Sequence, residues 1–342
     1  MSKITYENAG VNIQAGNEVV RRIKNMVKTT FNSNVLSNLG GFAGMIDLKS
    51  VIQNYQHPVL VQSIDGVGTK TIIARMMHKY DTLGIDLLSA SSNDILVTGA
   101  TPLTLLDYIA TDNLHPEIIE EIVKGMVKAC CDNDMALVGG ETAEMPDTYL
   151  KGEHDLVGIV TGVVEKNKII DGSKIKEGDA IVGFPSSGLH TNGYSLARKL
   201  FFDVGGFNVE SVLPEFKQTL GEVLLTPHIN YAKPILSAIK NGIEIKGMAH
   251  ITGGGLLENI PRVLPKICDA EIDLSAWETP EIFNVLEKLG NLDQHDLYTT
   301  FNMGIGLVAI LDEENAEKLI NKTQNLIKIG KIVSGTQKVK LK

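Results

Sequence analysis

The stretch "PVLVQSIDGVGTKT", Pro58 to Thr71, decides how the first half of the chain is expected to fold. Its first seven residues are mostly apolar and bounded by turn-forming residues, which indicates a β-strand. A loop with two glycines, an aspartate and a lysine follows. A Walker phosphate loop has Gly directly before its Lys, but Thr69 precedes Lys70 here. The loop is therefore either an ordinary glycine-rich turn or a site that handles phosphate by another geometry.

Strand-like and helix-like segments alternate on both sides of this stretch. An amphipathic pattern over residues 16–31 predicts a first helix, and its basic residues, including Arg21 and Arg22, are expected to face solvent. Further strands are expected at 102–111, 135–141 and 155–165, and further helices at 81–99 and 115–133. Pro116 suits the first turn of the last helix because its missing N–H has no partner there. This alternation of strands and helices predicts an α/β domain.

A charged, glycine-containing segment over residues 165–180 separates the two halves of the chain. We expect the domain boundary at about residue 170, with domains spanning 1–170 and 171–342. The second half predicts an α+β domain. Its expected strands are 180–184, 248–252, 304–311 and 328–335, and its expected helices begin at Gly193 and cover 256–264 and 313–324.

Composition limits the class of protein. The 342 residues include 43% hydrophobic and 21% charged residues, which is typical of a globular chain with a sizeable core. A net charge of −9 argues against general nucleic-acid binding. Three cysteines cannot form a disulfide framework, and no apolar run long enough for a membrane span is present. We therefore expect a cytoplasmic protein that uses local features to hold any anionic substrate.

Three carboxylates stand beside Gly or Asn at the ends of apolar elements, namely Asp65, Asp94 and Glu141. A charged group in apolar surroundings requires a partner. Mg²⁺ prefers a few carboxylate oxygens together with substrate phosphates, so the three residues are candidate metal ligands. In the alternative interpretation, Asp65 caps a turn, Asp94 is a satisfied buried group and Glu141 pairs with Lys70.

Glycine-rich loops before predicted helices are candidate anion sites. "SSGLHTNGYSLARKL" (186–200) and "TGGGLLENI" (252–260) share this layout, and backbone N–H groups at a helix start bind anions. Smaller glycine clusters lie at 40–44 and 139–141. The general base stays open among His190, His250 and Glu141.

The order of these motifs resembles a known family. "YENAGVNIQAGN", "LGGFAG", "DGVGTK", "GIDLLSASSNDILVTGATPL", "LVGGETAEMP", "SSGLHTNGYSLARK", "HITGGGLLENIPRVLP" and "TFNMGIG" together resemble the phosphoribosylformylglycinamidine cyclo-ligases, or AIR synthetases, of purine biosynthesis. The resemblance covers nearly the whole chain. It implies ATP-dependent closure of formylglycinamidine ribonucleotide to aminoimidazole ribonucleotide, with release of ADP and phosphate.

The resemblance also implies roles for individual residues. Asp65, Asp94 and Glu141 are expected to bind Mg²⁺, and Lys70 and His190 are expected to be catalytic. The expected ATP and phosphate contacts are Asp65, Gly66, Gly68, Thr69, Lys70, Asn93, Gly139, Gly140 and Glu141. The expected substrate contacts are Gly41, Ser187, His190, Asn192, Thr252, Gly253 and Gly254.

The family fold implies a homodimer whose N-terminal strands form a shared barrel, and it implies no nucleic-acid or membrane partner. Related ATP-using enzymes share the architecture. Formylglycinamidine synthetase and thiamine-monophosphate kinase remain alternatives, but "GGETAEMP" with "SSGLHTNGYSL" fits the cyclo-ligase better. A non-catalytic nucleotide sensor is a further alternative, whose mark would be the loss of an acidic residue or of Lys70, and all of these are present.

Overall fold

The computed structural model describes residue 6 and residues 9–342. It divides into two compact units. The first contains the chain up to Ile95 together with Thr101–Lys166, and the second contains Leu96–Ala100 and Asn167–Lys342. The motif "YENAGVNIQAGN" lies partly outside the described residues.

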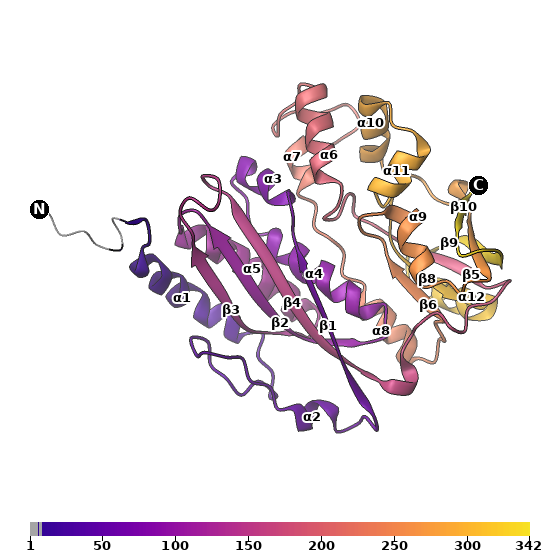
Figure 1. Ribbon diagram of the computed structural model, residues 1–342, viewed down its shortest axis with the longest axis horizontal. Coiled ribbons are helices and arrows are strands. Elements are labelled where there is room, and N and C mark those ends of the chain that lie inside the picture. Colours follow the sequence, from indigo (N-terminus) through magenta and orange to yellow (C-terminus); the bar gives the residue numbers. More distant parts are fainter. Residues whose placement is uncertain (1–5, 7–8) are drawn as a thin grey trace, which may run out of the picture. The chain divides into compact units, whose positions relative to one another are not determined.

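A four-stranded sheet in the order β1-β4-β2-β3 forms the centre of the first unit (Figure 1). Its strands are β1 (Pro58–Gly66), β2 (Thr101–Thr111), β3 (Ala136–Glu144) and β4 (His154–Glu165). The pairs β1–β4 and β2–β4 are antiparallel, and only β2–β3 is parallel. The expected strands are confirmed, but the sheet is mixed, so the α/β label needs correction for this unit.

Two helices, α4 (Leu83–Leu96) and α5 (Pro116–Asp132), lie along one face of this sheet (Figure 1). Glycines permit their close approach. A Cβ on Gly84 would lie 2.2 Å from the backbone N of Met126, and a Cβ on Gly158 of β4 would lie 2.9 Å from Leu87 of α4. Side chains at these glycines would push α4 away from both α5 and the sheet.

The opposite face of the sheet carries exposed apolar side chains. Leu60 and Ile64 of β1 are 59% and 66% exposed. Ile64 pairs with Ile159 of β4, so the two side chains share a face. This surface, which carries Leu60 and Ile64, is called the open face below.

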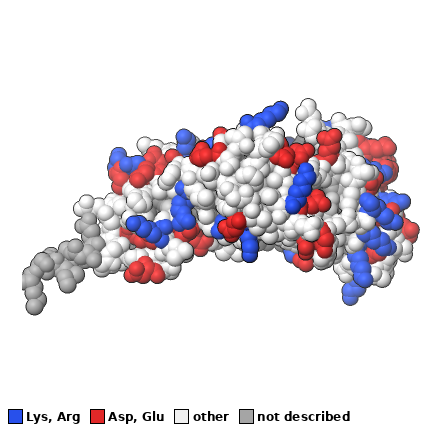
Figure 2. Space-filling view, turned by 90° about the horizontal axis from the view of Figure 1, so that it is seen from above, with Lys and Arg blue, Asp and Glu red and all other residues white. Residues whose placement is uncertain are grey.

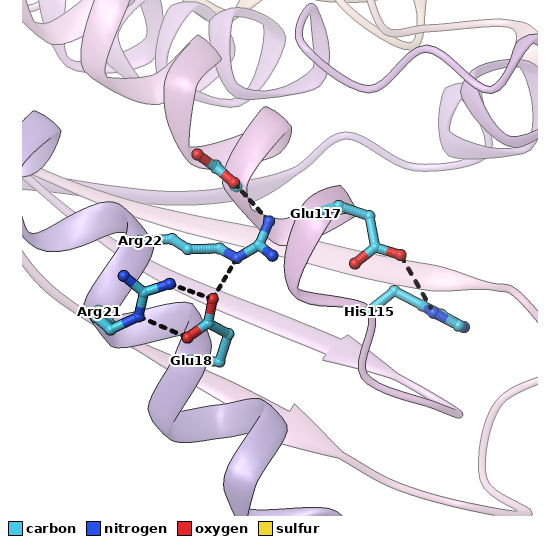
Figure 3. A network of polar contacts seen from close by, with 6 residues as sticks. Glu18, Arg21, Arg22, His115 and Glu117 are labelled. Atoms are coloured by element: carbon cyan, nitrogen blue, oxygen red, sulfur yellow. Dashed lines mark hydrogen bonds and ion pairs between the residues drawn. The ribbon is translucent and has the colours of Figure 1, made fainter.

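Helix α1 (Ile13–Lys28) is joined to α5 by a network of charges (Figure 3). Glu18 accepts hydrogen bonds from Arg21 and Arg22, and Arg22 also donates to Glu120 of α5 over 2.9 Å. The two arginines hold the pKa of Glu18 at about 2. Arg21 faces solvent as expected, with its side chain 74% exposed, whereas Arg22 is 34% exposed and also pairs across the two helices. Two shorter helices, α2 (Leu48–Ile52) and α3 (Lys70–Met77), complete the first unit.

A six-stranded sheet in the order β10-β7-β9-β5-β8-β6 forms the centre of the second unit. Four of its five strand pairs are antiparallel, and β10–β7 is parallel. The strands are β5 (Ala180–Pro185), β6 (Gly247–His250), β7 (Cys268–Ile272), β8 (Ile305–Leu311), β9 (Ile327–Ser334) and β10 (Val339–Leu341). Strands β7 and β10 were not expected from the sequence.

The helices of the second unit are α6 (Tyr194–Arg198), α7 (Leu220–Leu224), α8 (Ala232–Lys240), α9 (Gly255–Asn259), α10 (Glu281–Gly290), α11 (Gln294–Thr300) and α12 (Glu313–Lys322). Residues of α8 and α12 form one buried cluster with β5 and β8. Leu96 belongs to this cluster, which explains why Leu96–Ala100 are part of the second unit.

Charged side chains of both signs are mixed on the face shown in Figure 2. This face therefore presents no continuous basic stripe of the kind that a duplex requires. None of the helices in the described part of the chain has the length and apolar character needed to span a bilayer.

A buried ion pair fixes the start of β5 in the second unit. Lys246 Nζ lies 2.6 Å from Asp179 Oδ1, and both side chains are less than a tenth exposed. Asp179 also accepts a hydrogen bond from the backbone N–H of Lys176. Removing one partner would leave the other charge buried without compensation.

We predict that Asp179→Ala lowers the free energy of unfolding of the second unit by about 3–5 kcal/mol. Urea unfolding followed by the fluorescence of Trp277, the single and buried Trp, measures this unit. Glu244→Ala is the matched control because its pair with Lys174 is exposed on both sides, and it is expected to cost less than about 1 kcal/mol. Equal costs for the two variants would contradict the prediction.

Candidate active site

Asp65 lies near the end of β1, just before the loop that leads into helix α3. Asp65 Oδ1 accepts a hydrogen bond from the N–H of Gly66 over 2.8 Å. Gly68 has a φ of +65°, and a Cβ built there would meet none of the described atoms within 4 Å. Thr69 is the N-cap of α3 and, like Gly68, is exposed. The exposed Gly68 and Thr69 therefore lie within four residues of the half-buried Asp65 carboxylate.

Asp94 lies on the same side of the sheet as Asp65. It belongs to α4, and its Oδ2 accepts a hydrogen bond from Ser63 Oγ over 3.3 Å. Ser63 and Asp65 are two residues apart on β1, so their side chains share a face about 6.6 Å apart along the strand. Both carboxylates are half-buried, which leaves oxygen atoms of the type that Mg²⁺ prefers.

Lys70 has a partner within the first unit. Its side chain is fully buried, and its Nζ lies 2.8 Å from Asp86 of α4. Burial lowers the pKa of the Lys70 amino group, while the Asp86 carboxylate opposes that shift. Lys70 therefore pairs with Asp86 and not with Glu141, so that alternative is wrong, and its contact with phosphate stays a prediction. Asn93 is likewise fully buried.

Glu141 is separated from the other two carboxylates. It lies on β3, which is the opposite edge strand from β1, and pairs in register with Tyr108. Asp65 pairs with Gly158, which also pairs with Asp107, so Asp65 and Asp107 are on the same face of the sheet. Tyr108 is the next residue after Asp107, so Tyr108 and its partner Glu141 point to the other face. No group of three His, Cys, Asp or Glu residues in the described chain is arranged to hold a metal ion. The expected triad is therefore wrong as one site, and the pair of Asp65 and Asp94 remains.

Four other predicted residues meet around one cavity of about 900 Å³ in the first unit, beside α1 and β3. They are Gly41, Gly139, Gly140 and Glu141. Gly139 and Gly140 belong to β3, within the strand expected at 135–141. Apolar side chains of α1, including Val20 and Ile23, line the other wall of the cavity.

Asp107 of β2 also lines this cavity, and it was missed in the sequence. A Cβ on Gly140 would lie 2.2 Å from Asp107 Oδ1, so only Gly leaves room for this carboxylate. Burial raises the pKa of Asp107 to about 7. The signal was present, because an Asp inside the apolar strand "PLTLLDYIAT" requires an explanation as much as Asp94 does.

We predict that Asp107→Asn stabilises the chain at pH 8 by about 1–3 kcal/mol and has little effect at pH 4. The folded-state pKa lies above the usual value of 3.8, so the folded chain keeps a proton that the unfolded chain loses. The contribution of Asp107 to the free energy of unfolding is therefore largest below about pH 4, and it is lost as the pH rises through 7. Urea unfolding of the wild type and the variant at both pH values measures the effect.

The exposed Asp132 supplies the control for this experiment. Asp132→Asn is expected to change the free energy of unfolding by a similar, small amount at both pH values. A destabilised Asp107→Asn variant at pH 8 would show that the charged form of Asp107 is favoured in the folded chain.

Two candidate substrate loops of the second unit come together. The N–H of Gly253 donates to Asn192 Oδ1 over 3.1 Å, and Asn259 of α9 donates to the carbonyl groups of Thr252 and Gly253. Ser187 Oγ donates to the carbonyl of Pro227 over 2.5 Å. Gly254 has a φ of +96°, which only Gly adopts readily. The loops at 187–192 and 252–254 therefore form one surface.

His190 lies beneath this surface and is only 1% exposed. Its Nε2 accepts a hydrogen bond from the N–H of Ser187 over 3.2 Å, and its ring stacks on His228. The His190 ring is therefore buried below the loop surface, and its catalytic role stays a prediction. Its contacts suit a role in shaping the loop.

Known proteins resemble the whole chain. The family model "AIR synthase related protein, N-terminal domain" matches residues 47–164, and its C-terminal counterpart matches residues 176–342. A phosphoribosylformylglycinamidine cyclo-ligase from Carboxydothermus hydrogenoformans is 49% identical over 343 residues, covering 99% of each chain. The chain belongs to the phosphoribosylformylglycinamidine cyclo-ligase family. A cyclo-ligase from Thermoanaerobacter sp. (strain X514) is 50% identical and covers 94% of each chain.

Solved structures with low sequence identity to this member of the cyclo-ligase family share its fold. Thiamine-monophosphate kinase from Stenotrophomonas maltophilia has a TM-score of 0.69 with 17% identity and covers 95% of both chains. Hydrogenase maturation protein HypE in complex with ATP has a TM-score of 0.68 with 17% identity, covering 98% of this chain and 93% of HypE. The two-domain arrangement with mixed sheets and helices is thereby confirmed.

Proposed function

We propose that the chain catalyses the ATP-dependent cyclisation of formylglycinamidine ribonucleotide to aminoimidazole ribonucleotide, with release of ADP and phosphate. The observation that carries this proposal is the full-length identity of about half with cyclo-ligases. The paired carboxylates Asp65 and Asp94 agree with it. The activity belongs to purine biosynthesis, and three free cysteines are compatible with a cytoplasmic location.

Asp65 and Asp94 would hold Mg²⁺ together with phosphate oxygens of ATP. When bound, Mg²⁺ neutralises charge on the phosphates during transfer. The exposed residues Gly68 and Thr69, at the start of α3, would approach the phosphates through their backbone N–H groups. The cavity beside β3 would take the uncharged base and ribose, because the carboxylates of Asp107 and Glu141 disfavour phosphate there.

The reaction requires the protein to position its two substrates and does not require a covalent bond between protein and substrate. A formyl oxygen is a poor leaving group, so transfer of the γ-phosphoryl group of ATP to that oxygen prepares it to depart. The amidine nitrogen then attacks the same carbon, the imidazole ring closes and phosphate leaves with the oxygen. The second unit's loops at 187–192 and 252–254 would hold the anionic substrate through N–H and hydroxyl donors, such as the hydroxyl of Thr252.

We predict that the purified chain converts formylglycinamidine ribonucleotide to the aminoimidazole product with one ADP per product, and that Asp94→Asn lowers kcat/KM by about 100-fold or more. The fold should be retained because Asn keeps the shape and accepts from Ser63. Asp203→Asn, at an exposed carboxylate of the second unit, is the control. ATP binding without ADP formation by the wild type would favour a sensor, and near-normal Asp94→Asn activity would remove Asp94 from the site.

The open face supports a homodimer in which two sheets pack together into a barrel. Leu60 and Ile64 have no covering helix within the described chain, and their exposure is costly in water. A second copy presents an equally apolar face, so a two-fold arrangement covers both at once. The dimer is proposed as the form in which the enzyme works.

We predict that Ile64→Lys halves the molar mass measured by light scattering, because a charge on the open face opposes its burial. Ile267→Lys is the matched control, since Ile267 is 75% exposed on the second unit. A wild type of monomer mass, or an unchanged mass for Ile64→Lys, would contradict the proposed interface.

A further inference from the structure

Three buried histidines lie under the candidate substrate loops of the second unit. His190, His228 and His250 are 1%, 2% and 6% exposed. They come from distant segments, since His190 belongs to the loop before α6, His228 lies between α7 and α8, and His250 ends β6. His228 is in the middle. Its ring stacks on His190 with centroids 3.9 Å apart, and its Nε2 lies 3.1 Å from Nε2 of His250.

One proton is shared between the two ring nitrogens through which His228 and His250 face each other. Two imidazole nitrogens at 3.1 Å form a hydrogen bond only when one carries hydrogen and the other does not. The second nitrogen of His228, Nδ1, lies 3.3 Å from Thr191 Oγ1, which donates or accepts as required. Either tautomer of His228 therefore completes a chain from Thr191 through His228 to His250.

The packing around His190 leaves no space for adjustment. His190 has a φ of +58°, a conformation that is costly for a residue with a side chain. A Cβ on Gly306 of β8 would lie 2.5 Å from His190 Cε1 and 2.2 Å from the hydroxyl oxygen of Tyr231. The surrounding structure therefore holds His190 in place, and the His228 ring covers one side of it.

We propose that His228 is a positioning residue for substrate binding, acting through His190 and His250 on the two loops that follow them. Thr191 and Asn192 come directly after His190, and Ile251 to Gly254 come directly after His250. His228 contacts both histidines at once, so it fixes the position of one loop relative to the other. The same two loops are joined above it by the hydrogen bond between Asn192 and Gly253. This assignment rests on the proposed function, because that function makes these loops the substrate surface.

Steady-state kinetics with His228→Ala, His250→Leu and His250→Gln test the proposal. Leu at 250 removes the hydrogen bond, whereas Gln offers both an N–H donor and an oxygen acceptor to His228. We expect His228→Ala and His250→Leu to raise KM for the formylglycinamidine ribonucleotide about 10-fold, with KM for ATP and kcat changed less than about 3-fold. His250→Gln should stay close to the wild type.

Hydrogen exchange of the free protein gives a second measurement that needs no turnover. In His228→Ala and His250→Leu the amides of 187–192 and 251–255 should exchange faster together, with β5 and β8 unchanged. Exchange that rises in only one loop or in neither overturns the proposal, as does a His250→Gln variant that behaves like His250→Leu. An inactive wild type would overturn the proposed function alone, and the exchange result would still decide the role of His228.

Discussion

The buried ion pair between Lys70 and Asp86 holds together the part of the first unit on which its candidate site depends. Lys70 is the first residue of α3, directly after the loop of Asp65, and Asp86 lies in the first turn of α4. Separating two buried charges is costly, because each would then be buried without a partner of opposite charge. The pair therefore fixes the loop to α4. The same helix carries Asp94 eight residues later, about 12 Å along its axis.

Glycines set the distance between α4 and the sheet. Gly84 meets the backbone of α5, Gly158 meets Leu87, and a Cβ on Gly162 would lie 2.6 Å from Ile95. With side chains at these positions the helix would stand further away, and Ser63 would no longer reach Asp94. The acidic pair is thus a product of close packing on one face of the sheet. No helix of the described residues covers the open face in this way, and this difference between the faces is the basis of the proposed dimer.

Local patterns predicted much of the fold. The strands at 58–64, 102–111 and 155–165 and the helices at 81–99 and 115–133 are present, because apolar periodicity depends on neighbouring residues. Helix α3 was missed, since its eight residues follow a glycine-rich loop that the sequence did not separate from the helix. Gly139 and Gly140 lie in the strand expected at 135–141, but the sequence did not show that Gly140 makes room for Asp107.

The sequence by itself determined the family, most of the strands, the long helices α1, α4 and α5, and the candidate loops, because motifs and periodicity are properties of short segments. Only the tertiary structure decided which charged and polar groups are buried and what they contact. Lys70 meets Asp86, Glu141 points away from Asp65, and His190 lies on His228. These contacts join residues far apart in the chain, and a side chain's solvation is set by neighbours that come together only when the chain packs.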